Sequence, residues 1–321
     1  MNNAIPLEET IPWSHEVPRT ILIADSIETD GRFLLHTCAN QILKQPGGSK
    51  LWWITASPVS DRHIANGLKK IGCDVAASYL RNHSTSLLKI TSLGMEMTKQ
   101  LLLSSSMEEE SQVDPDSWTA ENYLKTLYQQ IKSWIEVEDT TSTTCHWLFL
   151  DDMSALATMV GDEGLVFQFM DSLCSLAMRR QDLGLMIRCS HELDQTLLKT
   201  SHIDETQDKT GWLGAGGLAQ KQETQRIHQS WIPWERTIES MDIVVDVIPL
   251  TSGYSREAHG RLVFTEYPGG RRWSVESKTK QSLGALAVPL VVSPWNKLVI
   301  NYCLQDNGVR AIRLRETTAA A

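Results

Sequence analysis

The segment Ser26-Ile-Glu-Thr-Asp-Gly-Arg-Phe33 follows an apolar run, Thr20–Ala24, and precedes a segment of helical periodicity, Phe33–Leu43. A strand, a loop and a helix in this order form the setting in which a G-x-x-x-x-G-K-[ST] loop wraps the phosphates of a nucleotide. The segment therefore predicts the strand, loop and helix of a P-loop protein.

The residues that bind phosphate in such a loop are replaced here. The second glycine remains as Gly31, but a serine stands at the first glycine position. Arg32 replaces the lysine, and Phe33 replaces the hydroxyl residue that holds magnesium. Glu28 and Asp30 add negative charge where the amides of a working loop attract phosphate. We therefore expect a degenerate loop that binds no nucleotide cofactor.

A second nucleotide-site pattern lies in Cys145-His-Trp-Leu-Phe-Leu-Asp-Asp152, an apolar strand that ends on two carboxylates. It resembles the Walker B carboxylate, which holds magnesium beside a nucleotide. Many parallel strands also end in polar residues, so the pattern alone leaves both interpretations open. After the degenerate loop it favours a P-loop-derived scaffold, with Gly31, Arg32, Asp151 and Asp152 as vestigial nucleotide-site positions and no catalytic residue.

The remaining sequence predicts one large α/β domain. Strand and helix patterns alternate through the first part, and short strands separated by turn residues follow near the end. This order is typical of one mixed sheet with helices on both faces, parallel first and then an antiparallel meander. The strands of the meander are expected at 242–250, 260–267, 272–277, 297–304 and 309–314.

The domain is expected to span 19–315, with flexible tails at 1–18 and 316–321 and loop insertions at 104–117 and about 203–232. No apolar stretch approaches the roughly 20 residues of a membrane span. The six cysteines lack C-x-x-C pairing, which argues against a disulfide framework and a zinc site. We expect no metal and no membrane partner.

Cations near the C-terminus suggest contact with nucleic acid. Arg271 and Arg272 precede a tryptophan, a mixture that suits phosphate pairing and base stacking, although a solvated hairpin face has the same composition. Lys221 and Arg226 are the candidate cations of the long loop. The net charge of −9 opposes strong binding by one chain, so we expect binding only where several subunits pool their loops.

Three patches resemble the family of the sixth subunit of the Elongator complex. They are Thr29-Asp-Gly-Arg-Phe-Leu-Leu-His36, Leu148-Phe-Leu-Asp-Asp-Met-Ser-Ala-Leu156 and Ala258-His-Gly-Arg-Leu-Val263. The resemblance implies a RecA-like fold with degenerate Walker motifs and no enzymatic activity. It also implies a hetero-hexameric ring with the fourth and fifth Elongator subunits, which joins the catalytic Elongator subcomplex. Such a ring binds tRNA and supports carboxymethyl-type modification of wobble uridine, in the cytoplasm, with a nuclear fraction left open.

Two other functions remain open on the sequence. One is an active nucleotide-dependent ATPase that uses Arg32 and Asp151. The other is a RecA-like recombinase paralogue that binds single-stranded DNA.

Overall fold

The structure is a computed structural model. It describes residues 5–11, 19–26, 28–45, 48–82, 85–96, 119–136, 145–190, 238, 240–250, 258–266, 288–289, 297–305 and 308–312.

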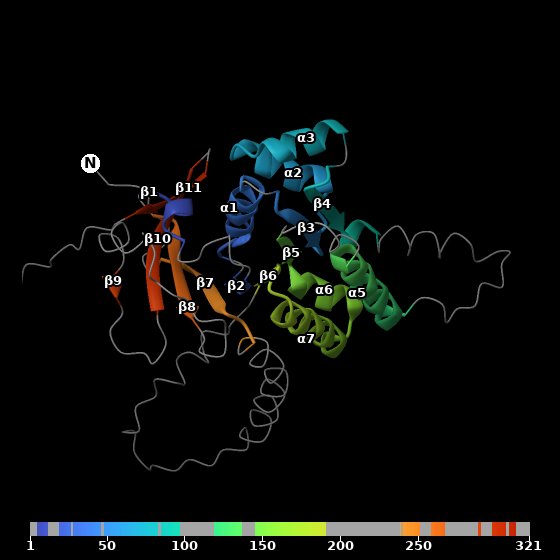
Figure 1. The fold of residues 1–321 in the computed structure, drawn as a ribbon. Coiled ribbons are helices and arrows are strands. Elements are labelled where there is room, and N and C mark those ends of the chain that lie inside the picture. The colour runs from blue at the N-terminus through green and yellow to red at the C-terminus, as the bar shows by residue number, and fades with distance from the viewer. Residues whose placement is uncertain are drawn as a thin grey trace, which may run out of the picture.

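One mixed sheet runs through the molecule (Figure 1). Its parallel part has the order β7-β2-β6-β5-β3-β4, so the first of these strands in the chain lies inside the sheet. This order differs from the 3-2-1-4-5-6 order of dinucleotide-binding folds. The strands are β2 (Thr20–Asp25), β3 (Lys50–Thr55), β4 (Leu88–Ser92), β5 (His146–Asp151), β6 (Leu183–Ser190) and β7 (Ile243–Pro249).

Antiparallel strands extend the sheet beyond β7, in the order β7-β8-β10-β11-β1, with β9 paired to β10. They are β1 (Ile5–Pro6), β8 (Gly260–Glu266), β9 (Val288–Pro289), β10 (Lys297–Gln305) and β11 (Gly308–Ile312). The expected change from parallel to antiparallel pairing is confirmed.

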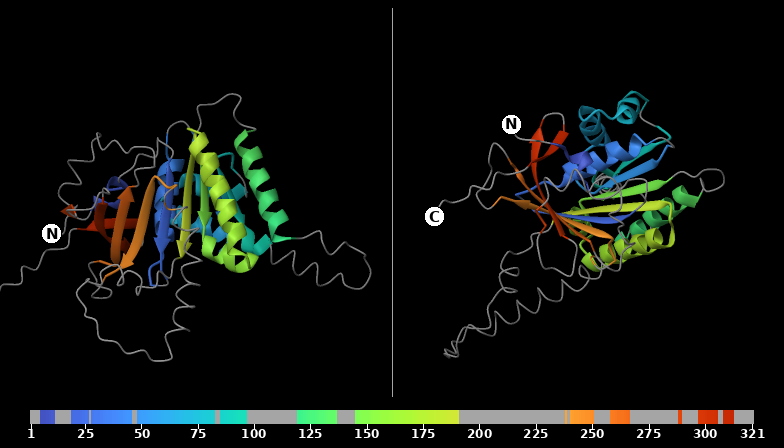
Figure 2. Two further views of the ribbon diagram at one scale, coloured as in Figure 1. Left: turned by 90° about the horizontal axis from the view of Figure 1, so that it is seen from below. Right: turned by 60° about the vertical axis from the view of Figure 1, so that its left-hand side comes forward.

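Helices cover both faces of the parallel part, which gives the three-layer αβα arrangement (Figure 2). One face carries α1 (Arg32–Leu43), α2 (Asp61–Lys70) and α3 (Asp74–Asn82). The other carries α5 (Ala120–Glu136), α6 (Met153–Val160) and α7 (Glu163–Arg179). None of the helices in the described ranges is long and apolar enough to cross a membrane.

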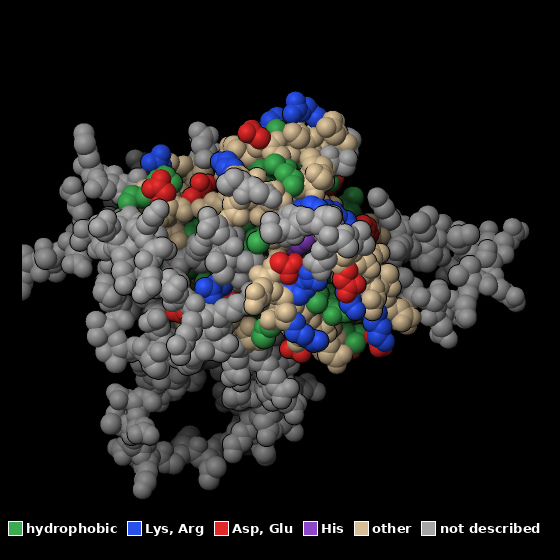
Figure 3. Space-filling view, in the orientation of Figure 1, with side chains coloured by type: hydrophobic (Ala, Val, Ile, Leu, Met, Phe, Trp, Pro, Cys, Tyr) green, Lys and Arg blue, Asp and Glu red, His purple; other side chains and the backbone are tan. Residues whose placement is uncertain are grey.

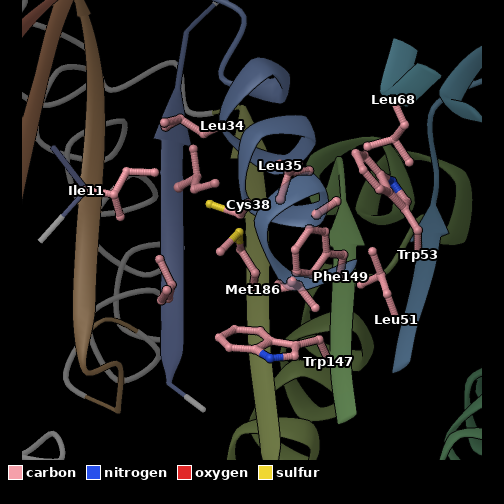
Figure 4. Close-up of a cluster of buried hydrophobic side chains, with 14 of the residues drawn as sticks. Ile11, Leu34, Leu35, Cys38, Leu51, Trp53, Leu68, Trp147, Phe149 and Met186 are labelled. Carbon is pink, nitrogen blue, oxygen red and sulfur yellow. The ribbon is translucent and has the colours of Figure 1, made fainter. Parts of the chain in front are cut away.

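The core has one large hydrophobic cluster on each side of the sheet because the central strands bury side chains on both faces. Beneath α1, the rings of Trp53, Trp147 and Phe149 are fully buried and pack with Leu35 and Met186 (Figure 4). Alternate residues of β3 and β5 thus fill one cluster, and their neighbours along each strand fill the other.

Residues 5–11 differ from the flexible tail expected over 1–18. β1 pairs with β11, and the 3-10 turn Leu7–Glu9 follows it. The side chains of Leu7 and Ile11 are buried in the cluster beneath α1. Strand pairing and apolar burial together offset the loss of chain entropy that ordering this segment costs.

Candidate functional site

The candidate site lies where the parallel strands β2, β5 and β6 end. Open α/β sheets bind ligands at this carboxyl edge. β6 lies between the other two strands, and Arg188 of β6 pairs in register with Ile23 of β2. The strand order therefore places the Arg188 side chain between Asp25 and Asp151, the last residues of β2 and β5.

Arg188 bridges these two carboxylates. Its Nη1 donates to Asp25 Oδ2 at 2.7 Å, and its Nε donates to Asp151 Oδ1 at 2.6 Å. All three side chains are at most 4% exposed. Two further carboxylate oxygens, from Asp152 and Asp30, lie 3.6 and 3.7 Å from the same guanidinium. Arg188 is the centre of a buried charge cluster.

The guanidinium of Arg188 stays charged in this setting. Burial lowers its pKa, but the charges of Asp151 and Asp25 and the hydrogen bonds to them act in the opposite direction and prevail. The pKa is therefore raised above its usual value.

Backbone amides of the loop after β2 donate hydrogen bonds to carboxylates of the protein itself. The Gly31 amide donates to Asp25 Oδ2 at 2.7 Å, and the Arg32 amide donates to Asp30 Oδ1 at 2.9 Å. A Cβ on Gly31 would lie 2.9 Å from Ile23 Cγ2 and 3.2 Å from Asp25 Oδ2, so only glycine permits this approach. An aspartate carboxylate thus occupies the place where a working loop presents its amides to phosphate.

The start of the loop is a tight turn. The Thr29 amide donates to the Ser26 carbonyl at 3.0 Å, and the Thr29 hydroxyl donates to the carbonyl of Val247 on β7 at 2.8 Å. These hydrogen bonds hold the loop against the sheet.

Arg32 links helix α1 to the ends of the neighbouring strands. Its Nε lies 3.2 Å from Asp151 Oδ2 without hydrogen-bond alignment, and its Nη2 donates to Ser57 Oγ at 2.8 Å. The Ser57 hydroxyl in turn donates to Asp152 Oδ2. Asp152 has a left-handed backbone, with φ of 67°, and its other oxygen caps α6 at the amide of Ala155.

Phe33 contacts the antiparallel part of the sheet. Its ring centroid lies 4.7 Å from that of Tyr302 on β10. The position that supplies a magnesium-binding hydroxyl in a working loop supplies an aromatic contact here.

The charges of the site oppose a nucleotide. Four carboxylates, from Asp25, Asp30, Asp151 and Asp152, surround two guanidinium groups. A triphosphate would add negative charge to a cluster that already has an excess of it. Within the described ranges, no set of three His, Cys, Asp or Glu side chains is arranged to hold a metal ion. The arrangement can join β2, β5, β6 and α1 through ion pairs.

All four predicted vestigial positions meet in this cluster: Gly31, Arg32, Asp151 and Asp152. The sequence analysis missed Arg188 and Asp25. An arginine inside the apolar run 183–189 was the available signal, because a buried strand accepts such a residue only with buried partners. The RNA-binding candidates Lys221, Arg226, Arg271 and Arg272 lie outside the described residues, as do 104–117, 203–232, 272–277 and 316–321.

The strand order, the layers and the loop after β2 define an α/β protein of the RecA-like class with degenerate Walker motifs. Similar solved structures include a KaiC-like protein from the hyperthermophilic archaeon Pyrococcus horikoshii, at 11% identity and a TM-score of 0.45, over 96% of this chain and 99% of that chain. Another is an uncharacterized protein of the same archaeon in complex with an unknown peptide, at 12% identity and a TM-score of 0.44, over 93% of each chain. No protein-family model and no curated protein matches the sequence.

Proposed function

We propose that this chain is a non-catalytic, RecA-like subunit of the Elongator complex, at the position of the sixth subunit. It assembles with the fourth and fifth subunits into a hetero-hexameric ring. That ring joins the catalytic Elongator subcomplex, binds tRNA and supports carboxymethyl-type modification of wobble uridine. The proposed location is the cytoplasm.

The Arg188 bridge between Asp25 and Asp151 is the observation that carries the non-catalytic part of this proposal. Phosphoryl transfer needs a loop cation and a metal to balance the charge that develops on phosphate. Here the cations are already paired with the protein's own carboxylates, and the loop amide of Gly31 is bonded to one of them. A site of this kind stabilises the fold instead of a transition state.

The three Elongator-like patches support the assignment to the sixth Elongator subunit. Residues of each patch contact another element of the sheet. The first patch contributes Gly31 and Phe33, and the second contributes Asp151 at the end of β5 and Asp152 at the start of α6. The third contributes Gly260, where a Cβ would lie 2.7 Å from the Tyr302 ring that Phe33 contacts. The first and third patches therefore meet at Tyr302.

The experiment is co-expression of this chain with the fourth and fifth Elongator subunits from the same source, followed by native mass measurement. The proposal predicts a stable species with two copies of each subunit, and a higher yield of soluble chain than expression of this chain alone gives. A soluble monomer that binds neither subunit contradicts the proposal.

The same assembly separates the proposal from its competitors. Preference for tRNA over single-stranded DNA of equal length is expected, and the reverse preference supports a recombinase paralogue. ATP turnover by the pure chain that is lost in Arg32→Ala and Asp151→Ala supports an ATPase.

A further inference from the structure

Helices α2 and α3 form a hollow on the molecular surface. Its lining residues come from both helices: Arg62, Asn66, Lys69, Ala77, Leu80 and Arg81, together called the α2–α3 hollow. In the space-filling view, Lys and Arg side chains lie at the top edge of the molecule, over α2 and α3, with an acidic side chain beside them (Figure 3).

The α2–α3 hollow is basic on a chain whose net charge is −9. Three of its lining side chains are cations, and none is a carboxylate. Over both helices, residues 61–82, there are four Lys and Arg side chains and two Asp side chains, Asp61 and Asp74. The Asp61 carboxylate accepts a hydrogen bond from the Tyr79 hydroxyl at 3.1 Å. Among the described residues no carboxylate forms an ion pair with Lys69 or Arg81. The hollow therefore suits an anionic ligand.

The spacing of the cations suits a chain of phosphates better than one phosphate group. Arg62, Asn66 and Lys69 are four and three residues apart and share one face of α2. At 1.5 Å per residue, Arg62 and Lys69 are about 10 Å apart along the helix axis. Arg81 approaches from α3, on the other side of the hollow. Cations spread over this length and on both sides can contact successive phosphates of one strand.

The polar chemistry of the hollow favours a polynucleotide over an acidic peptide. Two of the three cations are arginines, whose planar guanidinium matches two phosphate oxygens at once. The Asn66 amide offers both a donor and an acceptor, which suits a ribose hydroxyl. Ala77 and Leu80 supply an apolar floor for the sugar.

We propose that the α2–α3 hollow binds the phosphate backbone of a nucleic acid strand, and that it is a contact of this subunit with tRNA. The choice of tRNA rests on the proposed function. The residues that line the hollow come from α2 and α3 and are other residues than the cations predicted from the sequence.

The test compares two triple variants in the ring assembled with the fourth and fifth subunits. One is Arg62→Gln, Lys69→Gln and Arg81→Gln. Its control is Lys125→Gln, Lys132→Gln and Arg179→Gln, which removes equal charge from helices on the opposite face of the sheet. Fluorescence anisotropy of labelled tRNA is recorded from low to high salt for each assembly.

The hollow variant should bind tRNA about a hundredfold more weakly at 0.1 M salt, with a log–log salt slope smaller by about 2 to 3. The control variant should bind like the wild type. Equal binding by the hollow variant and the wild type overturns this inference and leaves the proposed function intact. A drop in affinity for polyglutamate with unchanged tRNA binding overturns it too, because the ligand is then an acidic protein segment.

Acylation of lysines in the unmodified chain gives an independent readout. Bound tRNA should protect Lys69 from a soluble acylating reagent and leave Lys125 reactive, as judged by peptide mass. If no ring forms, the proposed function fails, and the same labelling of the isolated full chain decides the inference. Protection of Lys69 by tRNA or by single-stranded DNA then supports the hollow as a backbone site, and equal reactivity with and without both overturns it.

Discussion

Arg188 on β6 and Asp25 at the end of β2 form a buried ion pair, with Nη1 and Oδ2 2.7 Å apart. The same Asp25 oxygen accepts the amide of Gly31, so one carboxylate satisfies both a guanidinium and the loop. The Asp25 carboxylate thus accepts from a loop amide, as a phosphate group does in a working P-loop. This relationship joins the end of β2, the loop after it and β6 through one carboxylate.

Arg188→Ala should be strongly destabilising because it leaves Asp25 and Asp151 buried without their cation. Breaking a buried pair from one side costs about 3–5 kcal/mol of unfolding free energy. Urea denaturation measures this value. The matched control is Arg180→Ala, which breaks the partly exposed pair with Asp182 and should cost less than about 1 kcal/mol. Equal effects of the two substitutions would contradict a structural role for Arg188.

Gly31→Ala should weaken the start of α1. The added methyl meets Ile23 Cγ2 at 2.9 Å and Asp25 Cβ at 3.2 Å, both close to the backbone of β2, and a cost of about 1–3 kcal/mol is expected. Gly164→Ala, in the first turn of α7, is the control. Its methyl meets only Asp162 Oδ1, at 3.2 Å, the oxygen that caps the helix at the Leu165 amide, and alanine has the higher helix propensity. Urea denaturation should show a lower free energy of unfolding only for Gly31→Ala. An unchanged urea midpoint for Gly31→Ala would argue against the close packing of the loop.

Phe33→Thr restores a hydroxyl at the magnesium-binding position of the loop. It should remove the contact with the Tyr302 ring, with a loss of about 1–2 kcal/mol, and should not create ATP binding. Phe33→Leu keeps apolar contact without a ring and should lose less. Thermal melts with and without magnesium and ATP measure both effects, and a nucleotide-dependent rise in the melting temperature of Phe33→Thr would contradict the account.

His36 should make stability depend on pH. Burial lowers the pKa of its imidazole below the usual 6.5, although the Arg32 carbonyl and nearby carboxylates partly oppose this. The unfolded chain then binds the proton more readily, so the stability that neutral His36 provides is present above about pH 6.5 and is lost as the pH falls toward the lowered pKa. Unfolding free energies at pH 7.5 and pH 5 should differ more for the wild type than for His36→Gln. Equal differences would contradict a neutral imidazole at this position.

Much of the fold follows from local patterns in the sequence. The run Lys50–Thr55 has apolar residues at consecutive positions, which predicts a strand buried on both faces, and it forms β3. Leu124, Leu127, Ile131 and Ile135 recur at helical spacing, which predicts a helix over 118–135. The structure has α5 there, and these four side chains share its buried face.

The candidate site was predicted only in part because its central contact is not local. Arg188 and Asp25 are 163 residues apart, and only the strand order brings them together. The turn made by Leu7 and Ile11 was missed for a similar reason, as its stability comes from pairing with β11 at the other end of the chain. The periodicity of apolar residues along the sequence predicts neither the ion pair nor the strand pairing.

The central claim is that this chain fills its own nucleotide position with ion pairs. Isothermal titration of the purified chain with magnesium and ATP tests it most directly, alongside Arg32→Ala and Asp151→Ala. The account predicts no saturable heat for any of the three proteins. Saturable binding of one nucleotide per chain that either substitution abolishes would contradict it.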